Sequence, residues 1–243
     1  MFFETLIHSM IKKTFYQNSK YAQELIQTFE SDFVFGEKTV NRIKISKINV
    51  VKKDQLVKLS ERINSIEDCS LKMNSKNIVM GDGNVDGSIM LIGEAPGLLE
   101  DKVGKPFQGD VGSLLNKMLL AINIKREKIY ITYALNFRPP EDRKPLGHEI
   151  RKYSEFLKEH ISIIDPKIII LMGSTAMEAV FRSNEKISET RGKWKEIILK
   201  NKTYPIMVTF SPSYLLRFPD KKKFSWEDLK NLRQKIGDLK INI

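Results

Sequence analysis

The sequence predicts an α/β fold, a three-layer α/β/α sandwich with a central four-stranded parallel sheet. From Gly87 onward, short apolar runs alternate with amphipathic helical patterns, and this order favours parallel strands joined by right-handed helical crossovers. The 243 residues, 41% of them hydrophobic, are enough for a sizeable core in one large domain. Loops rich in glycine and proline follow the apolar runs, where open sheets of this class place their functional groups.

The N-terminal part has a different pattern from the rest of the chain. Apolar residues recur at helical spacing from about 4 to 30 and predict a helical arm. Residues 31–53 are polar and basic without clear periodicity, so we interpret them as a linker. We therefore divide the chain into an arm and linker at 1–53 and a domain at 54–243. That domain is expected to open with a helix over 53–66, whose apolar face carries Leu56, Leu59, Ile63 and Ile66.

The strands and helices of the domain follow from the spacing of the apolar residues. Buried strands appear as short continuous apolar runs, and helices as apolar positions at i, i+3, i+4 and i+7. The predicted strands lie at 88–95, 128–135, 167–173 and 205–210, and the predicted helices at 110–122, 147–164, 174–181 and 225–236.

The composition favours some partners and disfavours others. Lysine and arginine total 41 against 30 acidic residues, a formal charge of +11. Such a surplus favours nucleic acid, because cations that neutralise phosphates release counterions; a solvated basic surface is the alternative. One cysteine, Cys69, permits no internal disulfide and no cysteine metal site, and the three histidines lack metal-ligand spacing.

No segment of the sequence resembles a membrane span or a signal peptide. The longest apolar run, 168–172, is far shorter than a bilayer requires. Glu4 and His8 interrupt the apolar N-terminus, which argues against a secretory signal. We therefore expect a soluble cytoplasmic protein.

The loop after the first strand, "GEAPGLLEDKVGKPFQGDVG" at 93–112, is the first candidate site. Its glycines allow backbone N–H groups to approach a ligand closely, although a tight structural turn has the same composition. Neither GxxxxGK[ST] nor GxGxxG spacing occurs, which disfavours nucleoside triphosphates and dinucleotides. Phe107 is suited to stack on a base; the alternative is a loop anchor buried in the core.

Two further segments are candidates for phosphate contacts. Arg138 and Arg143 flank a stiff proline-containing loop, where they could bind phosphates or form ion pairs with Glu141 or Asp142. Near the C-terminus, the run 221–223 places three lysines beside Phe224 and Trp226.

At this level of detail the sequence resembles a known family. "GEAPGLLEDKVGKPFQGDVGSLLNKML", "YITYALNFRPPEDRKP", "PKIIILMGSTA", "RGKW" and "TFSPSYLLRFP…SWEDL" occur in the order found in family 4 uracil-DNA glycosylases, particularly a bacterial branch with a long N-terminal arm. The resemblance covers about residues 55–240. It implies a four-stranded parallel sandwich and a monomer that hydrolyses the N-glycosidic bond of a deoxyuridine flipped out of DNA, in base excision repair.

The resemblance also implies roles for individual residues. Glu94 and Ser211 occupy the catalytic positions, and Phe107 matches the aromatic residue that stacks on the flipped base. The segment 212–217 matches a loop that wedges into the duplex and grips phosphates. The expected base-binding residues are Gly93, Ala95, Pro96, Gly97, Phe107, Tyr133 and Asp142, and the expected DNA-binding residues are Arg138, Arg143, Pro212, Ser213, Tyr214, Leu215, Leu216, Arg217, Lys221, Lys222 and Lys223.

Several departures from the family pattern bear on activity. Tyr133 stands where "YITN" has an asparagine that reads uracil, and Ser211 where "HPSY" has a histidine that stabilises the departing base. Asp142 replaces the asparagine of "PPxNR".

The family's cluster cysteines are also largely missing. Only Cys69 matches one of the four, while Ile66, Phe137 and Tyr153 stand at the other positions, so we expect no iron–sulfur cluster. Two hypotheses follow: a glycosylase for uracil or another deaminated base with altered or weakened activity, or a non-catalytic DNA-binding relative with a closed base pocket.

Overall fold

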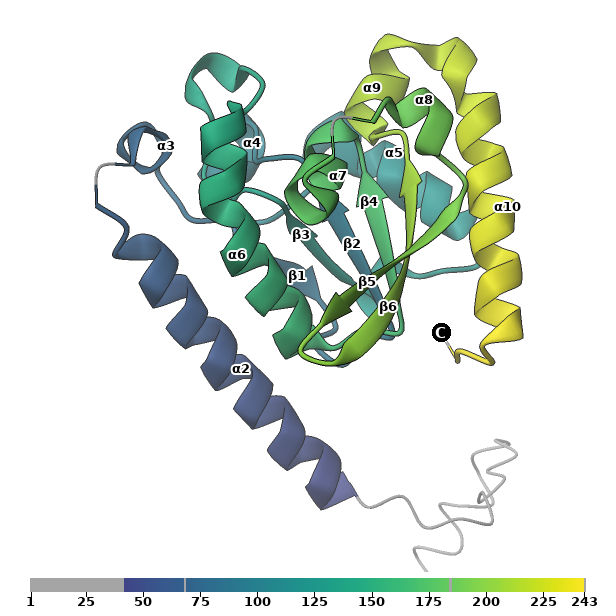
Figure 1. The fold of residues 1–243 in the computed structure, drawn as a ribbon, viewed down its shortest axis with the longest axis horizontal. Helices are drawn as coiled ribbons and strands as arrows, with labels where there is room; N and C mark the ends of the chain where they lie inside the picture. The colour runs from purple at the N-terminus through teal and green to yellow at the C-terminus, as the bar shows by residue number, and fades with distance from the viewer. Residues whose placement is uncertain (1–41, 68, 184, 243) are drawn as a thin grey trace, which may run out of the picture. The chain divides into compact units, whose positions relative to one another are not determined.

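A six-stranded sheet in the order β1-β3-β2-β4-β6-β5 forms the middle layer of the fold (Figure 1). The central four strands, β3, β2, β4 and β6, are parallel and overlap the four predicted strands, although β6 begins three residues before the predicted start at 205. Two antiparallel edge strands, β1 and β5, extend this group, so the prediction of a purely parallel four-stranded sheet is wrong at both edges. The strands span Asp82–Gly83 (β1), Ile89–Gly93 (β2), Tyr130–Tyr133 (β3), Ile168–Met172 (β4), Trp194–Leu199 (β5) and Lys202–Thr209 (β6).

The computed structural model describes residues 42–67, 69–183 and 185–242. The expected helical arm at 4–30 and the first part of the expected linker lie outside the described residues. Within the described range, helix α2 runs over Arg42–Asn64, so the helix expected from residue 53 starts eleven residues earlier and the stretch 42–53 is not a linker. Leu59 and Ile63 are buried, as the apolar face of the predicted helix requires.

Edge strand β5 pairs with β6 through a hairpin that the apolar periodicity did not reveal. Leu199 faces Lys202 across a two-residue turn, and both turn residues, Lys200 and Asn201, have positive φ, 46° and 63°. Two positive values define the type I′ turn, whose twist matches that of paired strands. None of the β5 residues is fully buried, and Lys195 and Glu196 interrupt its apolar residues, so its sequence lacks the longer apolar run that marks β2 and β4.

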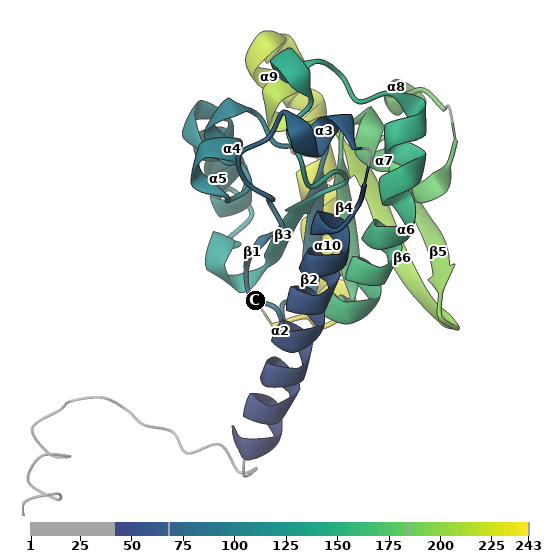
Figure 2. The same ribbon diagram turned by 90° about the vertical axis from the view of Figure 1, so that its left-hand side faces the viewer.

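Helices cover both faces of the sheet, as the sandwich prediction requires. The strand residues Met90 and Ile92 face α2, α6 and α7, whereas Ile89 and Leu91 face α5 and α10; Figure 2 shows α5 and α6 on opposite sides of the sheet. Burial on both faces explains why β2 and β4 are continuously apolar. The helices span Ser70–Met73 (α3), Leu98–Val103 (α4), Gly109–Leu120 (α5), Gly147–Ile164 (α6), Ser174–Phe181 (α7), Ile187–Thr190 (α8), Pro212–Arg217 (α9) and Lys222–Asp238 (α10), with short 3-10 turns at Arg126–Lys128, Pro140–Asp142 and Pro219–Lys221.

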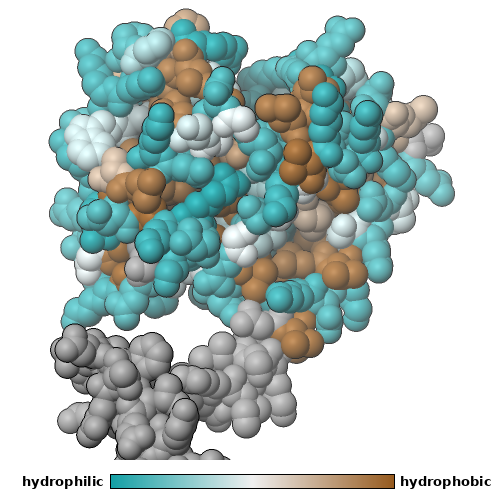
Figure 3. Space-filling view, turned by 180° about the vertical axis from the view of Figure 1, so that it is seen from behind, coloured by the Kyte–Doolittle hydropathy of each residue, from teal (hydrophilic) through white to brown (hydrophobic). Residues whose placement is uncertain are grey.

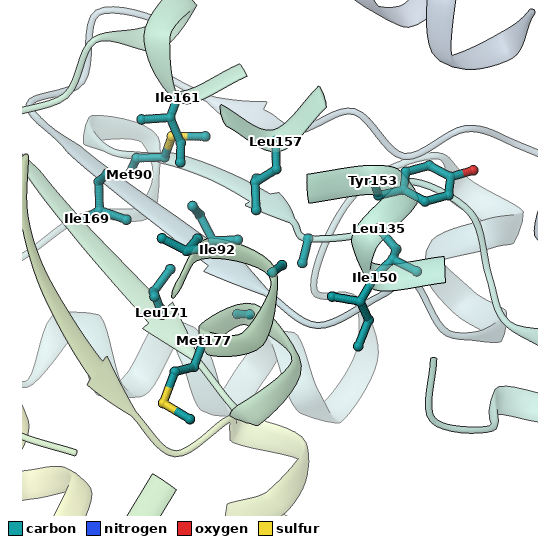
Figure 4. Close-up of a cluster of buried hydrophobic side chains, with 14 of the residues drawn as sticks. Met90, Ile92, Leu135, Ile150, Tyr153, Leu157, Ile161, Ile169, Leu171 and Met177 are labelled. Carbon is teal, nitrogen blue, oxygen red and sulfur yellow. The ribbon is translucent and has the colours of Figure 1, made fainter. Parts of the chain in front are cut away.

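The core under α6 consists mainly of isoleucine, leucine and methionine side chains. Figure 4 shows Ile161 and Leu157 of α6 beside Met90, Ile92 and Ile169 of the strands. On the surface drawn in Figure 3, apolar side chains lie in patches among hydrophilic ones. Across the described part of the chain, no helix combines the length and apolar character needed to cross a membrane.

Candidate functional site

The loops at the carboxyl ends of β2, β3, β4 and β6 border a groove of about 1060 Å3. Parallel strands end at the same edge of a sheet, so four loops far apart in sequence meet there. Cationic side chains outnumber acidic ones among the residues that line it, which suits an anionic ligand. The lining consists of residues 94–97, Pro139, 142–145, Gly173, Ser174, 185–188, Arg191, Phe210, Ser211, Ser213, Tyr214, Arg217, Lys221 and Phe224.

The two expected catalytic side chains, Glu94 and Ser211, lie on either side of Gly173. A Cβ placed on Gly173 would lie 3.7 Å from Glu94 Oε2 and 3.8 Å from Ser211 Oγ. Gly173 has a φ of 103° and begins α7, a conformation that side-chain-bearing residues rarely adopt. The glycine therefore leaves open the space at which the carboxylate and the hydroxyl converge.

Glu94 is held in place by a residue to which the sequence analysis assigned no role. The buried Thr175 donates from its hydroxyl to Glu94 Oε1 at 2.7 Å, leaving Oε2 directed to the space beside Gly173. The signal was present in the "GSTA" segment after the third predicted strand, but a serine or threonine in such a turn is equally typical of helix capping.

Ser211 is the N-cap residue of helix α9. Its Oγ accepts a hydrogen bond from the Tyr214 N–H at 3.3 Å and lies 3.0 Å from Ser213 Oγ, and Pro212 occupies the first position of α9. The hydroxyl thus already has partners in the protein. It can still contribute a neutral hydrogen bond in the groove, but no positive charge.

The expected base-stacking residue, Phe107, is covered by Tyr133. Their ring centroids lie 4.8 Å apart at an interplanar angle of 31°, and the side chains are only 4% and 5% exposed. The Phe107 N–H donates to Tyr133 Oη at 2.9 Å, and burial raises the pKa of the phenol, so it stays protonated. The Tyr133 ring thus packs directly on Phe107, the expected stacking residue, and Phe107 is a buried loop anchor in this structure.

The first loop is fixed by several polar contacts that the sequence analysis missed. The buried carboxylate of Glu100 accepts from the N–H groups of Gly97 and Gln108 at 3.0 and 2.8 Å. Arg126 donates to the carbonyl oxygens of Pro106 and Phe107.

The backbone conformation of Phe107 is consistent with these contacts. Its φ is 51°, a left-handed conformation that bulky residues adopt only where their surroundings impose it. Gly93 fits the same tight packing, since a Cβ there would lie 2.5 Å from the Phe107 ring.

The two arginines of the second loop form ion pairs within the protein. Arg138 binds both carboxylate oxygens of Asp142, at 2.7 and 2.9 Å, which is one of the pairings considered from the sequence. Arg143 instead binds the buried Glu149 at 2.6 and 2.9 Å and lowers the pKa of that carboxyl group. Phosphate contacts by these arginines remain predictions, and each would have to be made alongside an existing bidentate pair.

The expected wedge segment 212–217 is helix α9, and only part of it faces solvent. Leu216 and Arg217 are exposed, so they fit the expected DNA contact. Leu215 is buried in the core shared with α5 and α10, and Pro212 is buried as well. Both side chains anchor the helix in this structure, and their expected contact with DNA stays a prediction. The three lysines at 221–223 follow on the same side of the groove, where Lys221 contributes to its lining.

The motifs "RGKW" and "SWEDL" meet in one buried polar network beside the groove. Arg191 donates to Asp228 Oδ2 from Nε at 3.1 Å and to Oδ1 from a terminal nitrogen at 2.5 Å. Asp228 also accepts from the Thr209 hydroxyl at 2.7 Å. The indole N–H of Trp194 donates a hydrogen bond to Asn231 Oδ1 at 3.0 Å. The network ties the start of β5 and the end of β6 to α10, which fixes Arg191 at the groove.

The residues at the expected cluster positions do not fit an iron–sulfur cluster. Cys69 Sγ lies 3.3 Å from Tyr153 Oη, and Phe137 packs edge-to-face on Tyr153 at 6.4 Å. Figure 4 shows the Tyr153 hydroxyl directed away from the aliphatic cluster under α6. A cluster needs several thiolates, whereas Ile66, Phe137 and Tyr153 at the other three positions carry none.

The fold and the site place the chain among open α/β proteins with a groove at the carboxyl edge of the sheet. The charges that line this groove suit an anionic ligand. The family comparison makes this specific: residues 80–232 match the model of the uracil DNA glycosylase superfamily. The chain belongs to this superfamily.

Several relatives of the chain are type-4 uracil-DNA glycosylases. It is 40% identical to the type-4 enzyme of Thermotoga maritima over 161 residues, 65% of this chain and 82% of the relative. It is 36% identical to that of Sulfurisphaera tokodaii, covering 74% and 84% of the two chains, and 33% identical to that of Archaeoglobus fulgidus, covering 76% and 94%.

Proposed function

We propose that this protein hydrolyses the N-glycosidic bond of uracil, or of another deaminated base, flipped out of DNA, and that it does so with weakened activity. The observation that carries this proposal is the convergence of Glu94 and Ser211 beside Gly173 in a basic groove. Family membership and the names of the type-4 relatives support the reaction class. The contact between Phe107 and Tyr133 supports the weakening.

In this proposal Glu94 orients the attacking water or stabilises the positive charge that develops on the sugar. Thr175 occupies one carboxylate oxygen, so the other oxygen is available to the substrate. Ser211 and backbone N–H groups of the first loop donate to the departing base, on which negative charge grows. A positioned donor at such an oxygen is typically worth about 2.7 to 4 kcal/mol, and a neutral hydroxyl supplies less than a charged histidine.

Tyr133 limits the reaction in two ways. Its ring packs on Phe107 and fills the stacking position, so a flipped base enters only after the ring is displaced. Its single hydroxyl oxygen cannot accept from one edge atom of uracil while donating to the next, as the two separate atoms of an asparagine amide do, which weakens discrimination between bases.

The second candidate function is a non-catalytic DNA-binding protein. The specific observation in its favour is the same closed stack, together with the hydrogen bond from Phe107 N–H that holds the Tyr133 hydroxyl in place. In that case the groove binds the DNA backbone and no base is extruded into the protein.

We further propose that the protein acts as a cytoplasmic monomer on DNA, that it belongs to the bacterial branch with an N-terminal arm, and that it carries no iron–sulfur cluster. The aromatic packing at Tyr153 and the single thiol support the last point. Iron and sulfide analysis of anaerobically purified protein tests it, and stoichiometric amounts of both would contradict it.

The experiment that tests the activity is a single-turnover excision assay on oligonucleotides carrying uracil, hypoxanthine or xanthine. The proposed function predicts slow release of at least one of these bases, and loss of that release in Glu94→Gln. DNA binding without any release by the wild-type protein would favour the non-catalytic alternative.

A further inference from the structure

Three aromatic rings form a continuous stack from the end of β6 along α9. Phe210 and Tyr214 have centroids 4.9 Å apart at an interplanar angle of 27°, and Tyr214 and Phe218 lie 4.8 Å apart at 39°. Tyr214 lies within α9, and Phe210 and Phe218 lie just before and just after that helix. The inner two rings line the groove, so the stack leads outward from the site described above.

The outer end of this stack is open to solvent. Phe218 is 46% exposed although one ring already packs against it. Phe224, which is 37% exposed, is a further aromatic residue at the groove. A large apolar ring left exposed at the end of a stack can be covered by another flat ring, at the centroid spacings of about 4.5 to 7 Å typical of aromatic pairs.

Cations surround the exposed ring of Phe224. The ring of Phe224 has Arg191 at 5.2 Å, Lys221 at 5.8 Å and Lys223 at 5.2 Å from its centroid. Arg217 is exposed and lines the groove at the end of α9. Exposed aromatic rings beside several cations fit a ligand that carries both flat rings and negative charges.

We propose that this stack, with the lysines and arginines beside it, is a binding platform for single-stranded DNA, in which an unpaired base extends the ladder on Phe218. The inference rests on the proposed function only in taking DNA as the partner; it adds a second base-binding position outside the Phe107 pocket. Stacking on an aromatic side chain accepts any base and needs an unpaired one, because a paired base already has both faces covered. The adjacent cations bind the phosphates that flank that base.

The platform also accounts for DNA binding while Tyr133 covers Phe107. A strand held on Phe218 by stacking does not need the closed pocket. Binding through the platform is therefore independent of base extrusion, and it predicts tighter binding to single strands than to duplexes of the same length.

The test compares two single-stranded 15-mers, one of thymidine and one with abasic sites at every position, by fluorescence anisotropy at fixed salt. Both carry the same phosphate charge, but only the first has bases to stack. Phe218→Ala should weaken binding to the thymidine strand by about tenfold, within the range expected for one lost base stack, and should leave binding to the abasic strand within twofold. Phe218→Trp should restore the affinity.

Trp226→Ala is the matched control. Trp226 of α10 is also an exposed aromatic residue, at 42%, but it takes no part in the ring contacts that join Phe210, Tyr214 and Phe218, so its removal should change neither affinity. Thermal melting of each variant establishes that the fold is intact.

The outcomes separate this inference from the proposed function. If the wild-type protein binds the thymidine strand and Phe218→Ala binds it equally well, or loses affinity for both strands alike, the platform is wrong while DNA binding stands. If the wild-type protein binds neither strand nor a uracil-containing duplex, both the platform and the proposed function are wrong.

Discussion

Replacing Tyr133 by asparagine should open the base pocket, and doing so together with Ser211→His should restore excision. Tyr133 is almost fully buried against Phe107 and accepts its N–H. Asparagine is much smaller than tyrosine, and its side-chain amide can both donate a hydrogen bond to the edge of uracil and accept one from it. Ser211 borders the space beside Gly173, so a histidine there could approach the departing base.

The expected magnitudes follow from these contacts. A charged donor to the leaving base contributes about 2.7 to 4 kcal/mol, or 10² to 10³ in rate, but only if the base can enter. We therefore expect little gain from Ser211→His alone and a gain of at least about two orders of magnitude from the double variant. Because both residues act on the same bound base, the effects should be non-additive.

Opening the core also has a cost. Truncation of a buried aromatic residue typically costs about 3 to 5 kcal/mol, and asparagine at position 133 should approach this range. Thermal melting must therefore accompany every rate measurement.

The assay is single-turnover release of uracil from single-stranded and duplex oligonucleotides, with DNA affinity measured in parallel. Tyr133→Phe is the matched control, because it keeps the ring on Phe107 and removes only the hydroxyl, and it should stay as slow as the wild type. Rapid excision by the wild-type protein would refute the reasoning about Tyr133 and Ser211. So would a double variant that folds and binds DNA yet remains inert.

Four further outcomes are expected. Burial lowers the pKa of His160 from 6.5 to about 4, so between these pH values the unfolded state binds a proton that the folded state does not. The free energy of unfolding should therefore drop by up to about 3 kcal/mol as the pH falls from 6.5 to 4. Urea titrations should show this pH dependence in the wild type and not in His160→Gln. Tyr153→Ala should lower the free energy of unfolding by about 3 to 5 kcal/mol, and Tyr153→Phe by about 1 kcal/mol, because only the first empties the core; equal losses in denaturant melts would contradict this. Alanine at all three lysines of 221–223 should reduce the slope of log affinity for DNA against log salt, and an unchanged slope would leave a solvated basic surface as their role. Thr175→Val should slow excision with unchanged DNA affinity, since it frees the Glu94 carboxylate to rotate, while Thr175→Ser should retain the wild-type rate.

Much of the fold could be predicted because the relevant signals are local. The helices over 147–164 and 174–181 have the predicted bounds in the structure, since amphipathic spacing and flanking turn residues lie within the segment itself. The central strands were equally visible, because burial on both faces requires an unbroken apolar run. Edge strand β5 was missed because one of its faces meets solvent, and helix α4 because it is embedded in the glycine-rich first loop.

The sequence by itself determined the layered α/β architecture, the family resemblance and the identity of the loops that form the site, because each depends on residue types at short spacings. Only the tertiary structure decided how those residues meet. Whether Leu215 points into the core and whether Tyr133 lies across Phe107 depend on the packing of segments far apart along the chain. Such contacts leave no periodic signal, because each is set by where separate elements of the sheet and its helices come together in space.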